Sequence, residues 1–454
     1  MSRTLSPAFD GASSSSVWSQ AENGSSAPLS PCPDRCDVAI VGGGLSGLWL
    51  AYWLNRRRPE LQVLILEAER VGFGASGRNG GWLSALLPVS LTSLSKMIGI
   101  DDTIRMQTIM FEAVRDVGSI CATEGIQCDY ALGGTLSFVR TEAQHERALR
   151  DLADYADFGF AEHARMFDVA RTRERVSQTC ESVFRPDCAT IHPRRLVDGL
   201  TTVLRERGVT IVEKCRVRRF ESGLVSTDAG DVRCQYVIDC REAYGARASR
   251  RRVVPIHSLM IATEPLDETT WSRIGLAGRE TFTDHRHLLI YGQRTADGRI
   301  AFGGRGVGYH YGSRVDPSHD LHAGVHGDLR DSLVELFPDL ADSRITHRWG
   351  GALAAPRDWT WTVVLDPISR VGHLGGYTGD GVTSTFVAAR AMAEVISDGT
   401  TDLPLFGHRS RRWEPEPFRW IGVNAMNLLA GLVDRKEARG GHSRFLGYVL
   451  DRLL

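Results

Sequence analysis

The stretch D-V-A-I-V-G-G-G-L-S-G at residues 37–47 decides the fold of this chain. Residues 38–41 form a short apolar run, rich in β-branched side chains, that is typical of a buried parallel strand. Gly42, Gly44 and Gly47 follow in G-x-G-x-x-G spacing, and an apolar run compatible with a helix continues from them. In such a unit the glycines allow the tight turn, the approach of a pyrophosphate and close helix–strand packing. The amides and dipole of the helix start favour phosphate, so the stretch predicts a dinucleotide site.

An acidic residue stands where such a site needs one. Residues 61–66, L-Q-V-L-I-L, predict the next strand, and Glu67 ends it 20 residues after Gly47. An acid at this place accepts hydrogen bonds from the adenosine ribose. A glycine motif alone is weak evidence, and Glu67 alone fits a solvated strand end equally well. The complete strand-turn-helix-strand-acid unit favours the dinucleotide over both alternatives.

A glycine-rich run follows the acid at residues 70–82, R-V-G-F-G-A-S-G-R-N-G-G-W. Its five glycines let the backbone fold tightly against a ligand. We expect this loop to lie beside the dinucleotide, with Ser76, Arg78 and Asn79 available to its phosphates. An ordinary flexible loop is the less favoured alternative.

Another glycine-rich segment, G-G-Y-T-G-D-G-V-T at residues 375–383, precedes a helix-like run at residues 386–396. It repeats the arrangement that favours an anion at a helix start, and a plain capping turn is the alternative. Residues 303–306, G-G-R-G, look like a further dinucleotide loop, but Tyr309 stands where its third glycine should be. The sequence therefore predicts no separate NAD(P)H site.

Composition and charge argue against several classes of protein. Lys plus Arg number 54 and Asp plus Glu number 55 in 454 residues, and this balance gives no argument for nucleic acid or an anionic membrane. No apolar run approaches the ~18 residues of a membrane span. The nine cysteines are scattered, and neither Cys121 with Cys128 nor Cys234 with Cys240 has zinc-ligand spacing; we predict no metal. Their odd number in a large chain favours reduced thiols and a cytoplasmic location.

The motifs V-G-G-G-L-S-G, L-E-A and G-A-S-G-R-N-G-G resemble, in sequence and in order, those of the FAD-dependent D-amino-acid oxidase superfamily. The most similar branch contains glycine oxidase, sarcosine oxidase and gamma-glutamylputrescine oxidase, and G-A-S-G-R-N-G-G resembles the last type in particular. The resemblance covers nearly the whole chain after residue 35. It implies that FAD is bound by Gly42, Gly44, Leu45, Ser46, Gly47, Glu67, Ala68, Gly74, Ala75, Ser76, Arg78, Asn79, Gly80, Gly81, Val217, Gly351, Gly376, Tyr377, Gly379, Gly381, Val382 and Thr383.

The chain departs from the family pattern at residues 238–244, I-D-C-R-E-A-Y. Family members usually end this strand in a small A-T-[GN] sequence. The contacts with FAD at this corner, and the role of Asp239, Cys240 and Arg241, are therefore open.

The resemblance implies an α/β fold with a discontinuous Rossmann-type FAD-binding domain and an inserted α+β substrate domain built on an antiparallel sheet. Residues 1–34, rich in Ser, Pro, Gly and Ala, predict a disordered tail without the basic start or apolar core of a secretory signal. We expect the FAD-binding domain at residues 35–90, 185–255 and 345–400, the substrate domain at residues 91–184 and 256–344, and a helical C-terminal segment at residues 401–454.

Members of this family oxidise a C–N bond. The resemblance implies that a primary or secondary amine, or an amino acid, gives a hydride to flavin N5 and becomes an imine, and that dioxygen reoxidises the flavin to give hydrogen peroxide. Covalent members attach the flavin through His or Cys. The corresponding loop carries Arg78 and Asn79, and residues 350–383 contain no Cys, so we predict non-covalent FAD. Dehydrogenases with a quinone or carrier-protein acceptor and non-catalytic flavin-binding proteins remain alternatives, and the substrate and oligomeric state stay open.

Three residues are candidates for contact with the substrate. Arg305 suits a bidentate bond to a substrate carboxylate, or equally an interdomain ion pair. Tyr291 lies on a strand expected to cover the flavin and is either a cap over the ring or part of the core. His257 titrates in the right range to act near an amine, although a structural histidine is the commoner role.

Overall fold

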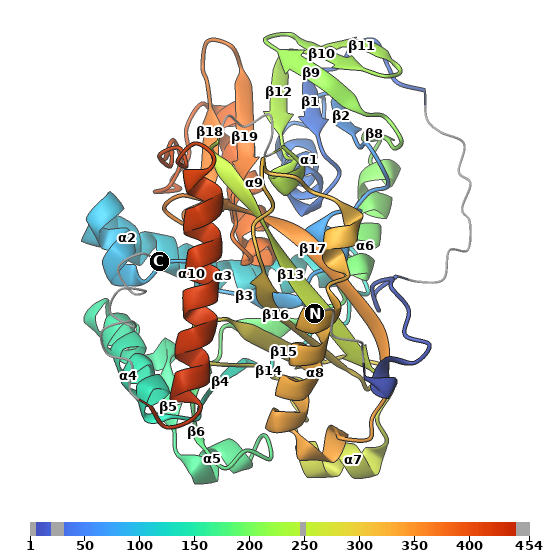
Figure 1. The fold of residues 1–454 in the computed structure, drawn as a ribbon. Helices are drawn as coiled ribbons and strands as arrows, with labels where there is room; N and C mark the ends of the chain where they lie inside the picture. Colours follow the sequence, from blue (N-terminus) through green and yellow to red (C-terminus); the bar gives the residue numbers. More distant parts are fainter. Residues whose placement is uncertain (1–5, 20–30, 246–250, 442–454) are drawn as a thin grey trace.

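The computed structural model describes residues 6–19, 31–245 and 251–441, apart from the side chains of residues 305 and 306. Two large sheets, one above the other in Figure 1, organise these residues. The upper sheet has the order β18-β19-β12-β1-β2-β8 and is parallel except for β18. Its strands are β1 (Val38–Val41), β2 (Val63–Leu66), β8 (Thr210–Val212), β12 (Tyr236–Asp239), β18 (Thr362–Leu365) and β19 (Val371–Gly375).

The two faces of this six-stranded sheet are covered differently. Val38 and Ile40 of β1 pack into the core that includes α1 (Leu45–Arg57), α6 (Pro193–Glu206) and α9 (Gly381–Asp398). Ala39 and Val41 point the other way, as alternation along a strand requires, into a core shared with a small antiparallel sheet. That small sheet consists of β9 (Val217–Glu221), β10 (Leu224–Thr227) and β11 (Gly230–Arg233).

The lower sheet has eight strands in the order β17-β13-β16-β15-β14-β4-β6-β5. All neighbours are antiparallel except β14 and β4, and Leu259, Ile261 and Phe302 pack against α8 (Ala323–Leu336) on one face. This mixed sheet, together with the parallel one, confirms the predicted α/β fold with a substrate domain. Its strands are β4 (Thr135–Val139), β5 (Arg165–Phe167), β6 (Glu181–Arg185), β13 (Val253–Thr263), β14 (Thr281–Asp284), β15 (Ile290–Arg294), β16 (Ile300–Val307) and β17 (Ile345–Pro356).

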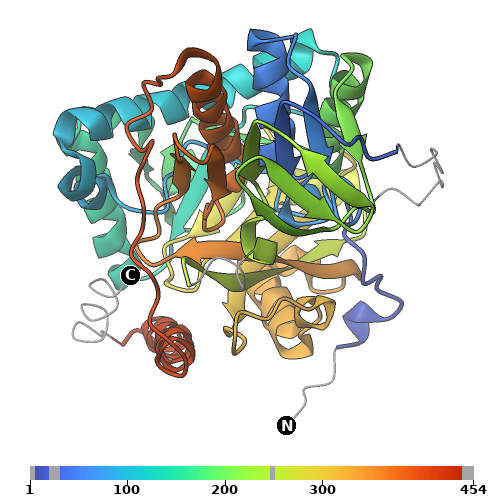
Figure 2. The ribbon, with the colours of Figure 1, turned by 90° about the horizontal axis from the view of Figure 1, so that it is seen from above.

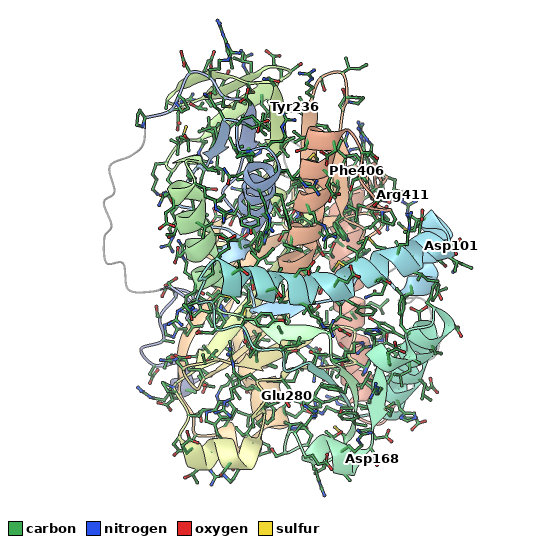
Figure 3. All side chains as sticks on the ribbon, turned by 180° about the vertical axis from the view of Figure 1, so that it is seen from behind. Asp101, Asp168, Tyr236, Glu280, Phe406 and Arg411 are labelled. Carbon is green, nitrogen blue, oxygen red and sulfur yellow. The ribbon has the colours of Figure 1, made fainter. Side chains whose placement is uncertain are left out.

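Two predicted domain boundaries are wrong. β17 was expected in the FAD-binding domain, but it pairs along its whole length with β13 of the eight-stranded sheet. α3 (Ile100–Thr123) was expected in the substrate domain, but it packs into the same core as α1 and α9 and crosses the molecule between the two sheets (Figure 3). The remaining elements are α2 (Leu91–Ile98), α4 (Glu142–Asp157), α5 (Val169–Arg173), α7 (Glu268–Ile274), β3 (Trp82–Ser84) and β7 (Cys188–Thr190).

The C-terminal segment contains the expected helix as α10 (Phe418–Glu437). It lies at the edge of the molecule and is seen end-on in Figure 2. The rest of the predicted helical segment, residues 442–454, is outside the described residues. None of the described helices combines the length and the apolar character that a membrane crossing requires.

The prediction of a disordered N-terminal tail is wrong for residues 6–19. This segment packs on the eight-stranded sheet, where Ser13 forms a bridge with His347 and the side chains of Phe9 and Trp18 are buried. The indole of Trp18 donates a hydrogen bond of 2.8 Å to the carbonyl of Asn79. Two large aromatic side chains bury enough apolar surface to fix a segment whose composition otherwise suggests disorder.

Replacing Trp18 should therefore destabilise the whole protein. We expect Trp18→Ala to lower the free energy of unfolding by about 3 kcal/mol, because it empties a buried indole site and removes one hydrogen bond. Urea denaturation measures the change. Trp420→Ala, at a position that is 42% exposed, is the control and should change the stability by less than about 0.5 kcal/mol. Equal losses in both variants would contradict the docked position of the segment.

His326 on α8 makes stability depend on pH. Burial lowers the pKa of His326 from 6.5 to about 4. Below pH 6.5 the unfolded chain binds a proton there that the folded protein does not, so stability falls as the pH decreases from 6.5 towards 4. We expect His326→Phe to lose less stability than the wild type over this range, by up to about 1.4 kcal/mol per pH unit. Parallel urea titrations at several pH values test this, and identical slopes would contradict it.

Candidate functional site

The first strand, its turn and the first helix form one end of the site. All four residues of β1 are buried, and the chain turns at Gly42 with a φ of +113°, a conformation that strongly favours glycine. A Cβ on Gly47 would lie 2.2 Å from the carbonyl oxygen of Gly42, so only glycine lets α1 begin this close to β1. At the start of α1 the amide of Leu45 donates 2.8 Å to the hydroxyl of Ser76.

A cavity of about 590 Å³ opens at this helix start, beside the carboxyl ends of β1, β2 and β12. Such an edge of a parallel sheet is where nucleotides bind in doubly wound folds. Most of the predicted cofactor residues line it: Gly42, Gly44, Leu45, Ser46, Glu67, Ala68, Gly74, Ala75, Ser76, Arg78, Asn79, Val217, Tyr377, Gly379, Gly381 and Val382. The structure places the others, Gly47, Gly80, Gly81, Gly351, Gly376 and Thr383, outside the cavity lining.

Glu67 lies at the end of β2 and faces the cavity. Its two carboxylate oxygens accept hydrogen bonds from the amides of Gly43, at 2.7 Å, and Glu69, at 2.8 Å. Burial raises the pKa of Glu67, and these amide bonds oppose the rise. Each oxygen keeps a second lone pair, so the carboxylate can still accept from vicinal hydroxyls such as those of a ribose.

The loop at residues 74–81 is closed by its own asparagine. Asn79 donates to the carbonyls of Ala75 and Ser76 at 3.1 and 3.0 Å and accepts from the amide of Gly81 at 2.7 Å. A Cβ on Gly80 would lie 2.5 Å from the ring of Tyr291. Gly80 and Gly81 therefore let β15 pack closely against the loop. They were predicted to line the cavity, but their role is in packing.

The second glycine-rich segment closes the opposite wall. Glu242 accepts from the amides of Gly376, at 2.7 Å, and Tyr377, at 3.3 Å, and so fixes the turn that leads into α9. No side chain caps the first turn of α9. The hydroxyls of Thr383 and Ser384 in that turn are buried without a hydrogen-bond partner. The uncapped amides at this helix start, where Gly381 and Val382 line the cavity, provide donors for an anionic or polar ligand group.

These features fit FAD. The cavity combines a helix start for pyrophosphate, a strand-terminal carboxylate for ribose and a second helix start at its far end. The family model described as DAO, FAD dependent oxidoreductase, matches residues 37–395. The chain belongs to this family. The DAO match covers every strand of both sheets and leaves out residues 6–19 and α10.

A curated relative and two solved structures are similar to this chain. Gamma-glutamylputrescine oxidoreductase of Escherichia coli (strain K12) is 29% identical over 415 residues, which cover 87% of this chain and 92% of the relative. Two solved structures share the fold. Glycine oxidase from Bacillus cereus has a TM-score of 0.65 at 18% identity, covering 84% of this chain and 100% of that one. L-proline dehydrogenase from P. horikoshii has a TM-score of 0.68 at 18% identity, covering 82% and 96%.

The corner at which this DAO chain departs from the family pattern lines the cavity. Cys240, Arg241 and Glu242 all contribute to it, and Arg241 forms a two-pronged ion pair with Asp239 at 2.8 and 3.0 Å. Burial opposes ionisation of Asp239, but bonds from His373 and Arg241 outweigh it and hold the pKa of Asp239 well below its ordinary value. Where the family pattern has small residues, this chain has the Asp239–Arg241 ion pair, which supports the cavity wall.

The predicted substrate-side residues of this DAO protein lie on the eight-stranded sheet. The hydroxyl of Tyr291 is 2.8 Å from that of Ser258, and its ring packs edge-on against Trp82. Nδ1 of His257 is 3.1 Å from a carboxylate oxygen of Asp320, and its buried Nε2 has no partner. The side chain of Arg305 is outside the described residues, and its backbone pairs with Ser258 on β13.

Asp320 was missed by the sequence analysis, although it connects the two domains. One of its oxygens contacts His257, and the other lies 3.3 Å from Nη1 of Arg78 in the glycine-rich loop. Asp320 also lines the cavity. No sequence signal marks it, because it ends a short 3-10 helix, Pro317–Asp320, outside every motif, and its partners come from two distant segments.

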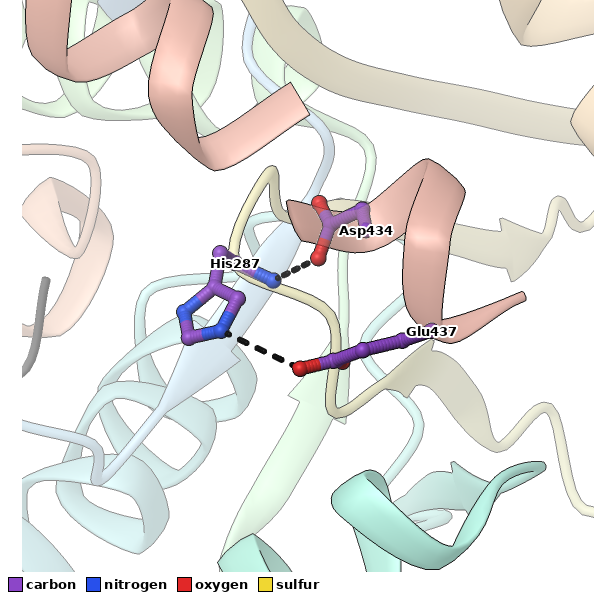
Figure 4. A group of neighbouring side chains, drawn as sticks. All are labelled: His287, Asp434 and Glu437. Atoms are coloured by element: carbon purple, nitrogen blue, oxygen red, sulfur yellow. Dashed lines mark hydrogen bonds and ion pairs between the residues drawn. The ribbon is translucent and has the colours of Figure 1, made fainter. Parts of the chain in front are cut away.

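Within the described residues, one group of side chains could ligate a metal ion: His287, Asp434 and Glu437 (Figure 4). Asp434 accepts from the amides of His287 and Leu288 at 2.9 and 2.8 Å. Arg147 binds both oxygens of Glu437, at 3.1 and 2.6 Å. The carboxylates therefore already have donors, and the group ties α10 to the eight-stranded sheet.

The Glu67 carboxylate gives a direct test of the cavity. We expect Glu67→Gln to weaken FAD binding by about 10- to 100-fold, because an amide cannot accept at both positions and carries no charge. Titration of the apoprotein with FAD, followed by flavin fluorescence, measures the dissociation constant. Glu60→Gln, which changes an exposed carboxylate just before β2, should bind FAD as the wild type does. Unchanged affinity in Glu67→Gln would contradict the ribose assignment.

Proposed function

We propose that this protein is an FAD-dependent oxidase that removes hydride from the carbon beside the nitrogen of a primary or secondary amine or amino acid. The observation that carries the proposal is the cavity that fits FAD. The eight-stranded sheet borders this cavity, and Tyr291 of that sheet packs against Gly80 of the glycine-rich loop. The relative whose name specifies gamma-glutamylputrescine supports an amine as substrate.

Glu67 and the amides at the start of α1 would hold FAD non-covalently, and the cofactor would supply a hydride acceptor for oxidation of the amine to an imine, with dioxygen, reduced to hydrogen peroxide, as the final acceptor. The protein has to hold the substrate as a neutral amine, because an ammonium nitrogen has no lone pair to support loss of hydride. His257 suits this task. With Nδ1 hydrogen-bonded to Asp320, its Nε2 is the nitrogen left to take the proton from the ammonium group.

Asp320 would act as a positioning residue. Its contact with Arg78 ties the loop beside the cavity to the strand that carries His257. Ser258 of β13 and Tyr291 of β15 form a hydroxyl pair across β16, and the ring of Tyr291 faces Gly80 of the loop. This arrangement would hold the reacting carbon close to the flavin, and positioning is the main contribution that the protein makes in such a reaction.

The purified protein provides the test. We expect a yellow protein whose colour enters the supernatant on acid precipitation and is bleached anaerobically by at least one of a panel of amines and amino acids. Admission of air should restore the colour and release peroxide. Reoxidation by a quinone dye without peroxide would favour the dehydrogenase alternative. A yellow protein that no amine bleaches would contradict the proposal and favour a non-catalytic flavin-binding role.

A further inference from the structure

A second cavity lies between α10 and the eight-stranded sheet, and we call it the α10 cavity. It has a volume of about 520 Å³, within the range of small-molecule sites. Its wall is largely apolar. Val254 and Ile256 of β13 contribute from one side, Ala355 of β17 and Trp413 from another, and Phe418 and Val423 from α10.

The α10 cavity lies next to the site already described. Leu353 lines the FAD cavity and Ala355 lines the α10 cavity. These residues are two apart in a regular stretch of β17, so their side chains leave the same face of the strand about 7 Å apart. His257 lines the α10 cavity and is hydrogen-bonded to Asp320, which lines the FAD cavity.

The charged side chains in the wall of the α10 cavity are engaged with one another or with neighbours. Arg357 pairs with Glu414 at 3.2 Å, and its guanidinium lies 5.1 Å from the ring of Trp413. Arg419 pairs with Glu416 at 2.8 Å. Among the described residues of this wall, no carboxylate is left unpaired to hold a second ammonium group.

Both ends of α10 are fixed, so the cavity is preformed. At its start, Glu416 accepts from the hydroxyl of Tyr309 at 2.7 Å and from the amide of Gly312 at 3.0 Å. At its end, Asp434 and Glu437 hold the helix through their contacts with His287 (Figure 4). A rigid apolar cavity binds an apolar group with little loss of protein entropy.

We infer that the substrate is an amine with an apolar, aryl-sized body, and that this body occupies the α10 cavity while the amine points toward the FAD cavity. The inference rests on the proposed amine oxidation and adds a substrate class to it. A polyamine or a small amino acid would leave the cavity unfilled, and a second charge would lose its hydration there without gaining a partner.

A matched pair of probes tests the inference. Putrescine and 4-phenylbutylamine share a four-carbon chain and differ only in an ammonium or a phenyl group at its end. Each is used also as its N-methyl derivative. We expect the second-order rate constant of anaerobic flavin reduction to be at least 100-fold higher for the phenyl compounds. Calorimetry on the same protein measures their binding independently of any reaction.

Two variants of α10 localise the effect. Val423→Glu introduces a carboxylate into the cavity wall and should cut the preference for phenyl over ammonium at least tenfold. Leu428→Glu makes a comparable change on the outer side of the helix, at a residue that is 66% exposed, and should keep the wild-type preference. If Val423→Glu does not fold, the wild-type comparison still decides the matter.

The outcomes separate the two proposals. Bleaching by putrescine as fast as by 4-phenylbutylamine would overturn the inference and leave the oxidase intact. Tight binding of 4-phenylbutylamine, lost in Val423→Glu but without bleaching by any amine, would support the cavity and contradict the oxidase. Absence of calorimetric binding by 4-phenylbutylamine together with bleaching by polar amines would overturn the inference alone. Neither binding nor bleaching by any amine would contradict both.

Discussion

Gly44→Val is expected to yield a folded but colourless protein that binds FAD at least 100-fold more weakly than the wild type. Gly44 precedes α1 and lines the cavity beside the first amides of the helix. A Cβ there would already lie 2.8 Å from the hydroxyl of Ser76, which holds the amide of Leu45. The two methyl groups of valine would extend towards the place where the pyrophosphate approaches the backbone. FAD titration of the apoprotein measures the loss.

The control for this prediction is another glycine replaced by the same residue. Gly327 lies inside α8, and a Cβ on it would meet nothing within 4 Å. Gly327→Val should therefore retain the colour and the thermal midpoint of the wild type. Circular dichroism establishes that Gly44→Val is folded. A yellow Gly44→Val protein with wild-type affinity would show that FAD is not bound at this helix start.

Glu242→Ala is expected to cost about 3 kcal/mol of stability and at least tenfold in FAD affinity. Burial raises the pKa of Glu242, and amide bonds from Gly376 and Tyr377 work against that rise. Removing the carboxylate leaves both amides without an acceptor, and each unpaired buried amide costs about 1–3 kcal/mol. The turn they belong to sets the start of α9, so its loosening should reach the cofactor as well as the fold.

Glu264 offers a matched comparison for Glu242. It also accepts from a backbone amide, that of Arg344 at 2.9 Å, but this contact is exposed. Water can replace the lost acceptor in Glu264→Ala, so we expect a change below about 1 kcal/mol and unaltered FAD binding. Urea denaturation and FAD titration are measured on both variants. Equal losses of stability and of FAD affinity in Glu242→Ala and Glu264→Ala would mean that burial does not determine what Glu242 contributes to them.

The sequence predicted those parts of the site that depend on local backbone chemistry. The turn at Gly42 and the close approach at Gly47 follow from the absence of a Cβ, and Glu67 follows from the length of one β-α-β unit. Each signal is complete within about 30 residues, as the motif requires. The loop at residues 74–81 was expected beside the cavity for the same reason, and its residues Gly74, Ala75, Ser76, Arg78 and Asn79 line the cavity.

The missed features depend on contacts between distant segments. Trp18 is buried only because residues 6–19 reach the eight-stranded sheet, and composition alone favours disorder there. β17 carries apolar residues that suit either sheet, and pairing with β13 decides between them. Asp320 gains its importance from Arg78 and His257, which lie 242 and 63 residues away. No periodicity or spacing in one sequence encodes such encounters.

The interleaved order of the strands also has a consequence for biosynthesis. β1, β12 and β19 are neighbours in space, yet they begin at residues 38, 236 and 371. A ribosome that has released only the first half of the polypeptide has delivered the nucleotide-binding turn without the segments that enclose it. Cofactor loading must then wait until translation has passed the start of α9, and nascent chains arrested earlier should emerge without bound flavin.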